Sequence, residues 1–153
     1  MATRAGSVIE PRIVADAHRL LDQAVAIADE GDIVVGNAER LRLYYLAALR
    51  AAGAVLVVLE SRRRAPRGQR SAWVRLEAQS GADAALGEDA AFFAGHSALR
   101  QRVETGLVRE VDQAVVARMR IRLSGLIAIA EDTLAGYEQG RTPSTSVRQS
   151  RSA

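Results

Sequence analysis

Apolar residues recur at helical spacing along most of the chain and predict five helices. The first covers residues 8–30, where the apolar positions follow one another every three or four residues: Ile13, Ala17, Leu20, Ala24 and Ile27. Ser7 and Glu10 have the spacing of a capping box at its start, and Pro11 suits a first helical turn. The other four helices are expected at 37–60, 72–80, about 88–104 and about 109–138.

The helix expected at 37–60 is apolar on nearly every side. Asn37 is its predicted N-cap, and an a/d pattern runs through three heptads while the opposite face is apolar as well. A helix of this kind is buried on several sides. Between Leu43 and Leu59 the one charged residue is Arg50, and Gly53 would allow a neighbouring helix to approach closely.

The short helix at 72–80 follows a loop that contains Pro66 and Gly68. Ser71 is its predicted N-cap, and Trp73 is its expected core anchor together with Leu76.

No convincing strand appears, so the predicted fold class is all-α. The helices are expected to form an antiparallel four-helix-type bundle with one additional short helix. The bundle domain covers residues 8–138, between a disordered N-terminus at 1–7 and a disordered basic tail at 139–153.

The amino-acid composition excludes several kinds of functional site. The chain has no cysteine, which excludes disulfides, thiolate zinc sites and cysteine nucleophiles. With two histidines, neither a metal centre nor a cofactor is predicted. The longest uncharged apolar run, Ala51–Leu59, is half of a membrane span, and no signal-peptide core follows Met1. We therefore expect a cytoplasmic protein that does not enter a membrane.

The charge is distributed unevenly. All 21 basic residues are arginines, against 18 acidic residues, and a GC-rich genome explains most of the preference for arginine over lysine. Residues 61–75 hold six arginines and no acid: Arg62, Arg63, Arg64, Arg67, Arg70 and Arg75. This segment has the charge density of a phosphate-binding loop, and a solvated loop without a ligand is the alternative. Because Trp73 is the one aromatic residue nearby, stacking of single-stranded bases is not predicted.

Arg50 is the most informative single residue, because a guanidinium stays charged inside a protein and is costly to bury without a partner. Two interpretations remain open: an ion pair across the bundle, or a cleft arginine aimed at a phosphate or a second subunit. Glu39, Arg40 and Tyr45 are further cleft candidates. The alternative for Glu39 and Arg40 is a solvated helix start, and for Tyr45 a place in the core.

No catalytic residue is predicted. Neither His18 nor His96 has a nucleophile motif, a glycine-rich phosphate loop or metal-ligand spacing around it. A partly exposed, non-catalytic side chain is the favoured interpretation of both histidines.

Several stretches together resemble the HEPN-domain superfamily, specifically an actinobacterial subfamily, over about residues 10–138. They are the segment 37–56, the arginine loop ending in Arg70-Ser-Ala-Trp73, Ala90-Ala-Phe-Phe93 and the long last helix. The resemblance implies an all-α bundle that associates with nucleic acid, often as a dimer. It marks Arg50, Arg70 and Trp73 as residues that shape a cleft.

The ribonuclease members of that superfamily carry an arginine, four to six residues and then a histidine on a late helix. The last helix of this chain has no histidine, and the matching spacing from Arg12 to His18 lies in the first helix. The resemblance therefore transfers no catalytic residue.

Three functional hypotheses follow. The first is a non-catalytic or divergent HEPN-like domain that binds RNA, DNA or a nucleic-acid-handling protein in stress response, RNA processing or DNA repair. The second is a helical adaptor that forms a homodimer or docks another protein, as the apolar helix at 37–60 indicates. The third is a divergent, metal-independent endoribonuclease.

Overall fold

The computed structural model describes residues 8–62 and 70–140. The elements are α1 (Pro11–Ile33), α2 (Asn37–Leu59), a 3-10 helix (Glu60–Arg62), α3 (Ala72–Glu77), α4 (Ala84–Ala94), α5 (Ser97–Glu104) and α6 (Gln113–Glu138). The described ranges contain no strand, which confirms the all-α prediction. The disorder predicted for 1–7 and for nearly all of the tail falls outside the described residues.

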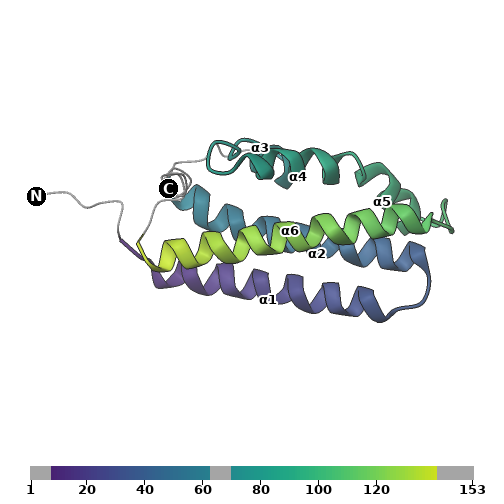
Figure 1. Ribbon diagram of the computed structural model, residues 1–153, viewed down its shortest axis with the longest axis horizontal. Helices are drawn as coiled ribbons and strands as arrows, with labels where there is room; N and C mark the ends of the chain where they lie inside the picture. Colours follow the sequence, from purple (N-terminus) through teal and green to yellow (C-terminus); the bar gives the residue numbers. More distant parts are fainter. Residues whose placement is uncertain (1–7, 63–69, 141–153) are drawn as a thin grey trace, which may run out of the picture.

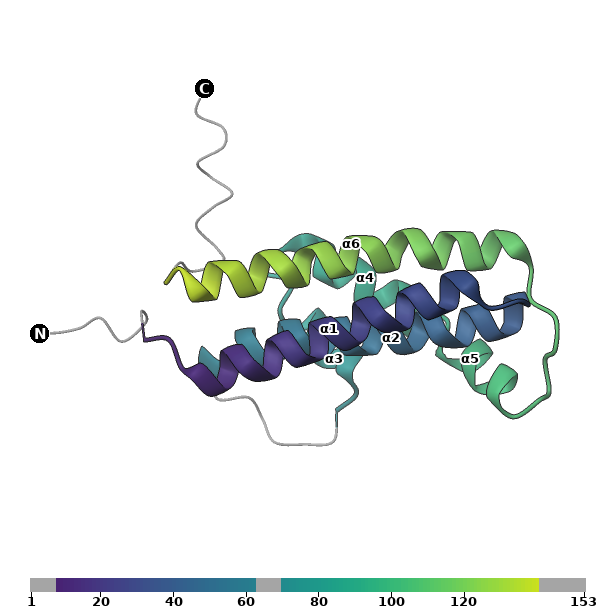
Figure 2. The same cartoon turned by 90° about the horizontal axis from the view of Figure 1, so that it is seen from below.

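The long helices form a bundle around α2. α1 and α2 form an antiparallel hairpin, and α6 lies along both of them (Figure 1). α4 and α5 follow one another along a further side, where α4 contacts α6 and α5 contacts α2 (Figure 2). These two helices together take the place of a fourth long helix, and α3 is the additional short one.

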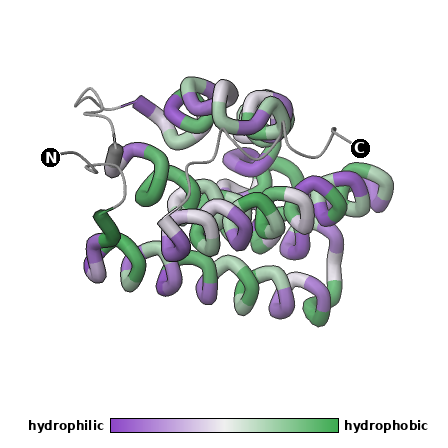
Figure 3. The backbone as a smooth tube through the Cα atoms, turned by 60° about the vertical axis from the view of Figure 1, so that its left-hand side comes forward, coloured by the Kyte–Doolittle hydropathy of each residue, from purple (hydrophilic) through white to green (hydrophobic). Residues whose placement is uncertain are grey.

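The central position of α2 follows from its composition, since nearly all its sides are apolar. Leu41, Ala48, Ala52 and Val55 are completely buried. By length and composition α2 could span a membrane, but 67% of that stretch is buried inside the bundle, as in a core helix. In α1, by contrast, hydrophobic and hydrophilic positions alternate around the helix, as the tube in Figure 3 shows.

Small residues allow α1 to approach α2 closely. A Cβ atom at Gly53 would lie 3.3 Å from Leu20 Cδ1, so this glycine has the role that the sequence predicts. Gly31, near the end of α1, is buried against α2 more tightly still.

The substitution Gly31→Ala is expected to lower the free energy of unfolding by about 1–3 kcal/mol. Its Cβ would lie 2.7 Å from Cε1 of the Tyr44 ring, which is buried and held by a hydrogen bond to Asp32. Gly125→Ala in α6 is the control, because nothing lies within 4 Å of its Cβ position. That change should stabilise the protein by about 0.5–1 kcal/mol. Urea unfolding measures both, and a Gly31→Ala variant as stable as the wild type would contradict the tight contact.

The predicted caps are only partly correct. Asn37 is not the N-cap of α2: Gly36 occupies that position, and the Asn37 side chain donates instead to the Val111 carbonyl, 3.2 Å away. Glu10 is the N-cap of α1 without a side-chain cap, while Pro11 begins the helix as predicted. Asn37 therefore ties the start of α2 to the segment before α6.

The single helix predicted at about 88–104 is wrong, because the chain forms two helices there. α4 ends at Ala94 and α5 begins at Ser97. The Ser97 hydroxyl donates to the Ala94 carbonyl at 2.9 Å, a local bond that competes with the helical ladder. The apolar spacing from Phe92 to Leu99 continues across this break, which is why periodicity alone does not reveal it.

Candidate nucleic-acid interface

α3 is fixed to the bundle by an aromatic cluster. Trp73 is 5% exposed, and its Nε1 donates to the Tyr45 hydroxyl at 2.8 Å. Its ring stacks on Phe93, with centroids 5.2 Å apart, and Tyr45 meets both rings edge-on. Trp73 is thus a core anchor, as predicted, and Tyr45 lies in the core rather than in an open cleft.

The arginine-rich segment at 61–75 has both of its ends held. Arg75 donates from Nε and Nη2 to the two carboxylate oxygens of Glu60, at 3.1 and 2.6 Å. These hydrogen bonds raise the pKa of Arg75. The predicted Ser71 cap is confirmed, since its Oγ accepts from the Val74 amide at 3.2 Å. The end of α2 and the start of α3 are therefore joined at the base of the segment.

Of the five other arginines in this segment, only Arg70 has a side chain that the structure describes. Arg70 is exposed and forms no ion pair or hydrogen bond in the described part of the chain. The other members of the predicted binding set, whose side chains fall outside the described residues, are Arg62, Arg63, Arg64 and Arg67. The geometry thus defines the base of the segment and, beside it, the Arg70 guanidinium, which has no partner among the described residues.

Arg50 does not form the ion pair across the bundle that one interpretation of the sequence requires. It is half-buried on α2, and no ion pair or hydrogen bond to it occurs within residues 8–62 and 70–140. The ion-pair interpretation from the sequence is therefore wrong in the described structure, and the open-cleft interpretation stays a prediction.

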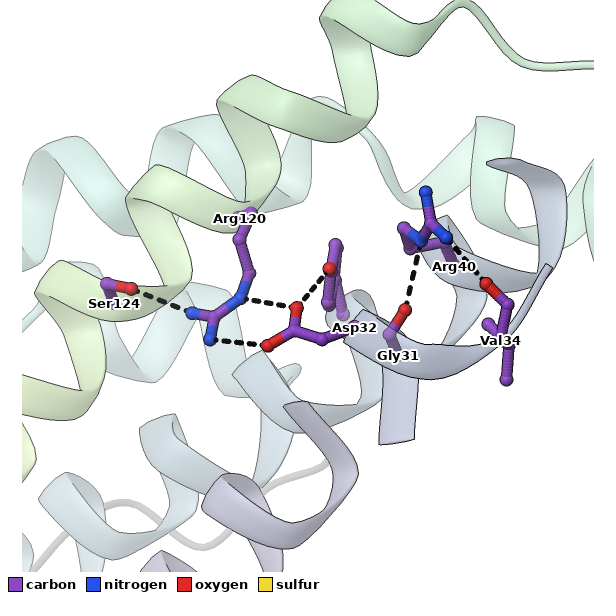
Figure 4. Close-up of polar contacts among 7 residues, drawn as sticks. Gly31, Asp32, Val34, Arg40, Arg120 and Ser124 are labelled. Atoms are coloured by element: carbon purple, nitrogen blue, oxygen red, sulfur yellow. Dashed lines mark hydrogen bonds and ion pairs between the residues drawn. The ribbon is translucent and has the colours of Figure 1, made fainter. Parts of the chain in front are cut away.

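Glu39 and Arg40 have structural partners at the hairpin between α1 and α2. Arg40 donates to the carbonyls of Gly31 at 3.0 Å and Val34 at 2.5 Å, which holds the connection in place (Figure 4). Glu39 is exposed and paired with Arg42, whose hydrogen bonds lower the pKa of that carboxyl. Among the described residues, neither side chain forms a hydrogen bond or ion pair with Arg50, Arg70 or Trp73, so the solvated helix start fits Glu39 better than a cleft.

Asp32 connects α1, α2 and α6 beside this hairpin. Arg120 donates to its two oxygens at 2.9 and 3.0 Å and to Ser124 at 2.7 Å (Figure 4). Tyr44 donates its hydroxyl to the same carboxylate. The hydrogen bonds from Arg120 lower the pKa of Asp32, and burial together with Asp32 raises the pKa of Tyr44. Because each group has a partner, we interpret this network as a structural link.

A second polar cluster, which the sequence does not reveal, lies where α4 meets α6. Arg122 Nη1 donates to Oδ1 of Asp89 at 3.2 Å, and its Cζ lies 5.3 Å from the centre of the Phe92 ring. The ring of His96 packs against the ring of Phe92, with centroids 4.4 Å apart, and so joins this cluster. His96 Nδ1 donates to the Phe92 carbonyl at 2.8 Å, and the second ring nitrogen, Nε2, has no hydrogen-bond partner among the described residues.

Arg100 extends this cluster toward the aromatic anchor of α3. Its Cζ lies 4.7 Å from the centre of the Tyr45 ring, and its Nη1 donates to Glu104 at 3.0 Å. Its Nε is buried without a hydrogen-bond partner among the described residues. The four-residue spacing of Phe92–His96 and Arg100–Glu104 could have indicated these two contacts from the sequence. Nothing local could have indicated the contact of Arg100 with Tyr45.

Asp89 has an unusual environment for a carboxylate. It is 4% exposed, and burial raises its pKa more than the nearby Arg122 lowers it.

The remaining histidine, His18, is exposed and connects α1 with α6. Its Nε2 lies 3.2 Å from Oε2 of Glu138. Within the described ranges, no three His, Asp or Glu side chains come together to hold a metal ion.

Comparison with known proteins gives one family match. A family model described as a HEPN-like domain matches residues 33–131. No curated protein and no solved structure matches the chain significantly. The matched range contains α2, the arginine-rich segment, the Trp73 cluster and the contact between Asp89 and Arg122.

Proposed function

The chain belongs to this HEPN-like family, and on that premise we propose that it binds nucleic acid through the arginine-rich segment at 61–75. The observation that carries the proposal is the closed base of the segment. The Glu60–Arg75 pair and the Trp73–Tyr45 hydrogen bond hold its two ends against the bundle. A segment held at both ends loses less conformational freedom when it binds than a free tail does.

The charge of the segment supports contact with phosphates. Glu60 compensates Arg75, and the segment contains five further arginines and no acid. Such a group neutralises backbone phosphates and releases counterions, independently of base sequence. Trp73 is buried beneath Tyr45 and Phe93, so it is not available to stack on a base. The proposal is therefore a sequence-tolerant contact with RNA or DNA, in RNA processing, DNA repair or stress response.

The proposal assigns a binding role and no catalytic residue. α6, which is the late helix of the bundle, contains no histidine. His96 precedes α5, and its carbonyl accepts a hydrogen bond from the backbone amide of Arg100 at 3.0 Å. The His96 ring is linked to the guanidinium of Arg122, on another helix, only through the Phe92 ring. This arrangement differs from the ribonuclease motif, in which an arginine precedes a histidine by four to six residues on one late helix.

Changing Arg62, Arg63, Arg64 and Arg67 to serine is expected to weaken binding and to flatten its salt dependence. Each phosphate contact that is lost should reduce the slope of log affinity against log salt by roughly 0.7–0.9. Fluorescence anisotropy with a short single-stranded RNA and a short DNA duplex measures both quantities over a salt series.

The matched control removes the same net charge elsewhere. The control changes four exposed arginines that have no ion pair in the described structure: Arg12, Arg102, Arg109 and Arg118. Changing them to serine should leave most of the slope of log affinity against log salt unchanged. Equal losses from both sets would show a general charge effect and contradict a local interface. Binding by the first variant as tight as that of the wild type would also contradict it.

A further inference from the structure

The solvent side of α6 carries a heptad pattern of its own. Residues at alternating spacings of four and three are all exposed: Ala114, Arg118, Ile121, Gly125, Ala128 and Asp132. We call these six residues the α6 seam. The buried residues of α6, among them Met119, Leu123 and Leu126, form the opposite side of the helix, and Figure 2 shows α6 along one edge of the bundle. Heptad spacing is the pattern by which one helix packs along another, and this seam faces away from the core.

The middle of the seam is apolar and open. Ile121 lies well inside α6 and is 71% exposed. Its neighbours Gly125 and Ala128 are small, and no described atom outside the helix lies within 4 Å of the Gly125 Cβ position. A large side chain beside small ones lets a second helix approach closely and take the isoleucine into a hole between its own residues.

The two charges of the seam are placed symmetrically about this apolar centre. Arg118 lies seven residues before Gly125 and Asp132 lies seven residues after it. Neither side chain forms an ion pair within residues 8–62 and 70–140. If a second α6 lies antiparallel along the first with the two-fold axis at Gly125, each Arg118 faces the Asp132 of the other copy. A parallel pair would instead place like charges opposite one another, which is unfavourable.

We infer that the α6 seam binds a second copy of this chain in an antiparallel helix pair centred on Gly125. Two Arg118–Asp132 ion pairs then flank two buried Ile121 side chains. The charge pattern selects this occupant, because an identical helix supplies the opposite charge at both positions and a two-fold contact uses the same residues on both subunits. The inference is independent of the proposed nucleic-acid contact at 61–75, and its test contains no nucleic acid.

One pair of helices gives a contact smaller than a standard protein interface, so we expect a dissociation constant of roughly 10–100 μM. Below about 1 μM the chain is then monomeric. Under those dilute conditions Arg118 is an exposed arginine, and its replacement changes charge alone.

Sedimentation equilibrium of the full chain, from about 1 to 500 μM, measures the dimer. Arg118→Asp and Asp132→Arg should each weaken it at least about tenfold, because each change places like charges opposite one another. The combined variant restores both pairs with their signs exchanged, and its dissociation constant should return to within about threefold of the wild type. Arg102→Asp on α5, an exposed arginine without an ion pair in the described structure, is the matched charge reversal and should leave the dimer unchanged.

Ile121→Ser tests the apolar centre of the seam. It should weaken the dimer at least about tenfold, because the contact buries this side chain twice. It should leave the thermal midpoint of the dilute chain unchanged, since the side chain is exposed in the monomer. A lower midpoint would mean that Ile121 supports the fold instead. A strict monomer over the whole concentration range would overturn the inference. So would a dimer that Ile121→Ser leaves intact, or a combined charge variant as weak as the single ones.

Discussion

Replacing Trp73 with alanine is expected to lower the free energy of unfolding by about 3–5 kcal/mol. The change removes the largest side chain of α3 from the core, together with its stacking on Phe93 and its hydrogen bond to Tyr45. α3 contains six residues, too few to form a stable helix by itself. Its attachment therefore depends on Trp73 and Leu76, the two residues of α3 that are buried.

Urea unfolding followed by circular dichroism measures the loss, and Trp73→Phe separates its parts. Phenylalanine keeps an aromatic ring against Phe93 but leaves the Tyr45 hydroxyl without its donor, which should cost about 1–2 kcal/mol. If Trp73→Ala costs less than this conservative change, the aromatic cluster is not what holds α3. A detached α3 also frees one end of the arginine-rich segment, so Trp73→Ala should weaken RNA binding under conditions where the bundle remains folded.

The fold could be predicted largely because one helix dominates it. α2 ends within a residue of the predicted range, since its residues from Leu43 to Leu59 are nearly all apolar, with Arg50 as the one charge among them. The break between α4 and α5 could not be predicted in the same way. It depends on a serine hydroxyl and on a turn at Gly95 and His96, while the apolar period continues across it.

The candidate site was predictable where a residue stands out from its neighbours in the sequence. Arg50 does so, being the one charge between Leu43 and Leu59, and Trp73 does so as the one tryptophan. Their partners were not predictable, because tertiary contacts decide them. The bond from Trp73 to Tyr45 spans 28 residues, and whether Arg50 has a partner in the described structure depends on all the helices around it. Arg40 shows the converse, since a residue that suggests a cleft holds a turn instead.

Arg122 shows most clearly how charge and packing are coupled in this bundle, and its loss should produce a penalty that depends on pH. Arg122→Met is expected to lower the free energy of unfolding by about 2–3 kcal/mol at neutral pH. The side chain of Asp89 is 6% exposed, and the change leaves its carboxylate without its cation. Methionine is an unbranched apolar side chain that can fill part of the space beside the Phe92 ring, over which the guanidinium carbon of Arg122 lies.

The direction of the pH dependence follows from the pKa of Asp89. Burial already raises this pKa above the ordinary carboxyl value of about 3.9, so the folded state holds the proton more tightly than the unfolded state does. The contribution of Asp89 to stability is therefore most favourable below the ordinary value and declines as the pH rises through the raised one. Removing Arg122 takes away the opposing charge and raises the pKa further. The penalty of Arg122→Met should consequently be small near about pH 4 and grow toward pH 7.

Urea unfolding of the wild type and the variant over this pH range gives the penalty as a difference at each pH. Asp89→Asn supplies the second arm, because an amide cannot ionise: in that background Arg122→Met should cost little and should not depend on pH. Arg118→Met, one turn earlier on α6 and without an ion pair in the described structure, is the control for loss of charge alone. A penalty that is constant with pH, or that persists undiminished in the Asp89→Asn background, would mean that Arg122 stabilises the contact between α4 and α6 through Phe92 and packing rather than by compensating Asp89.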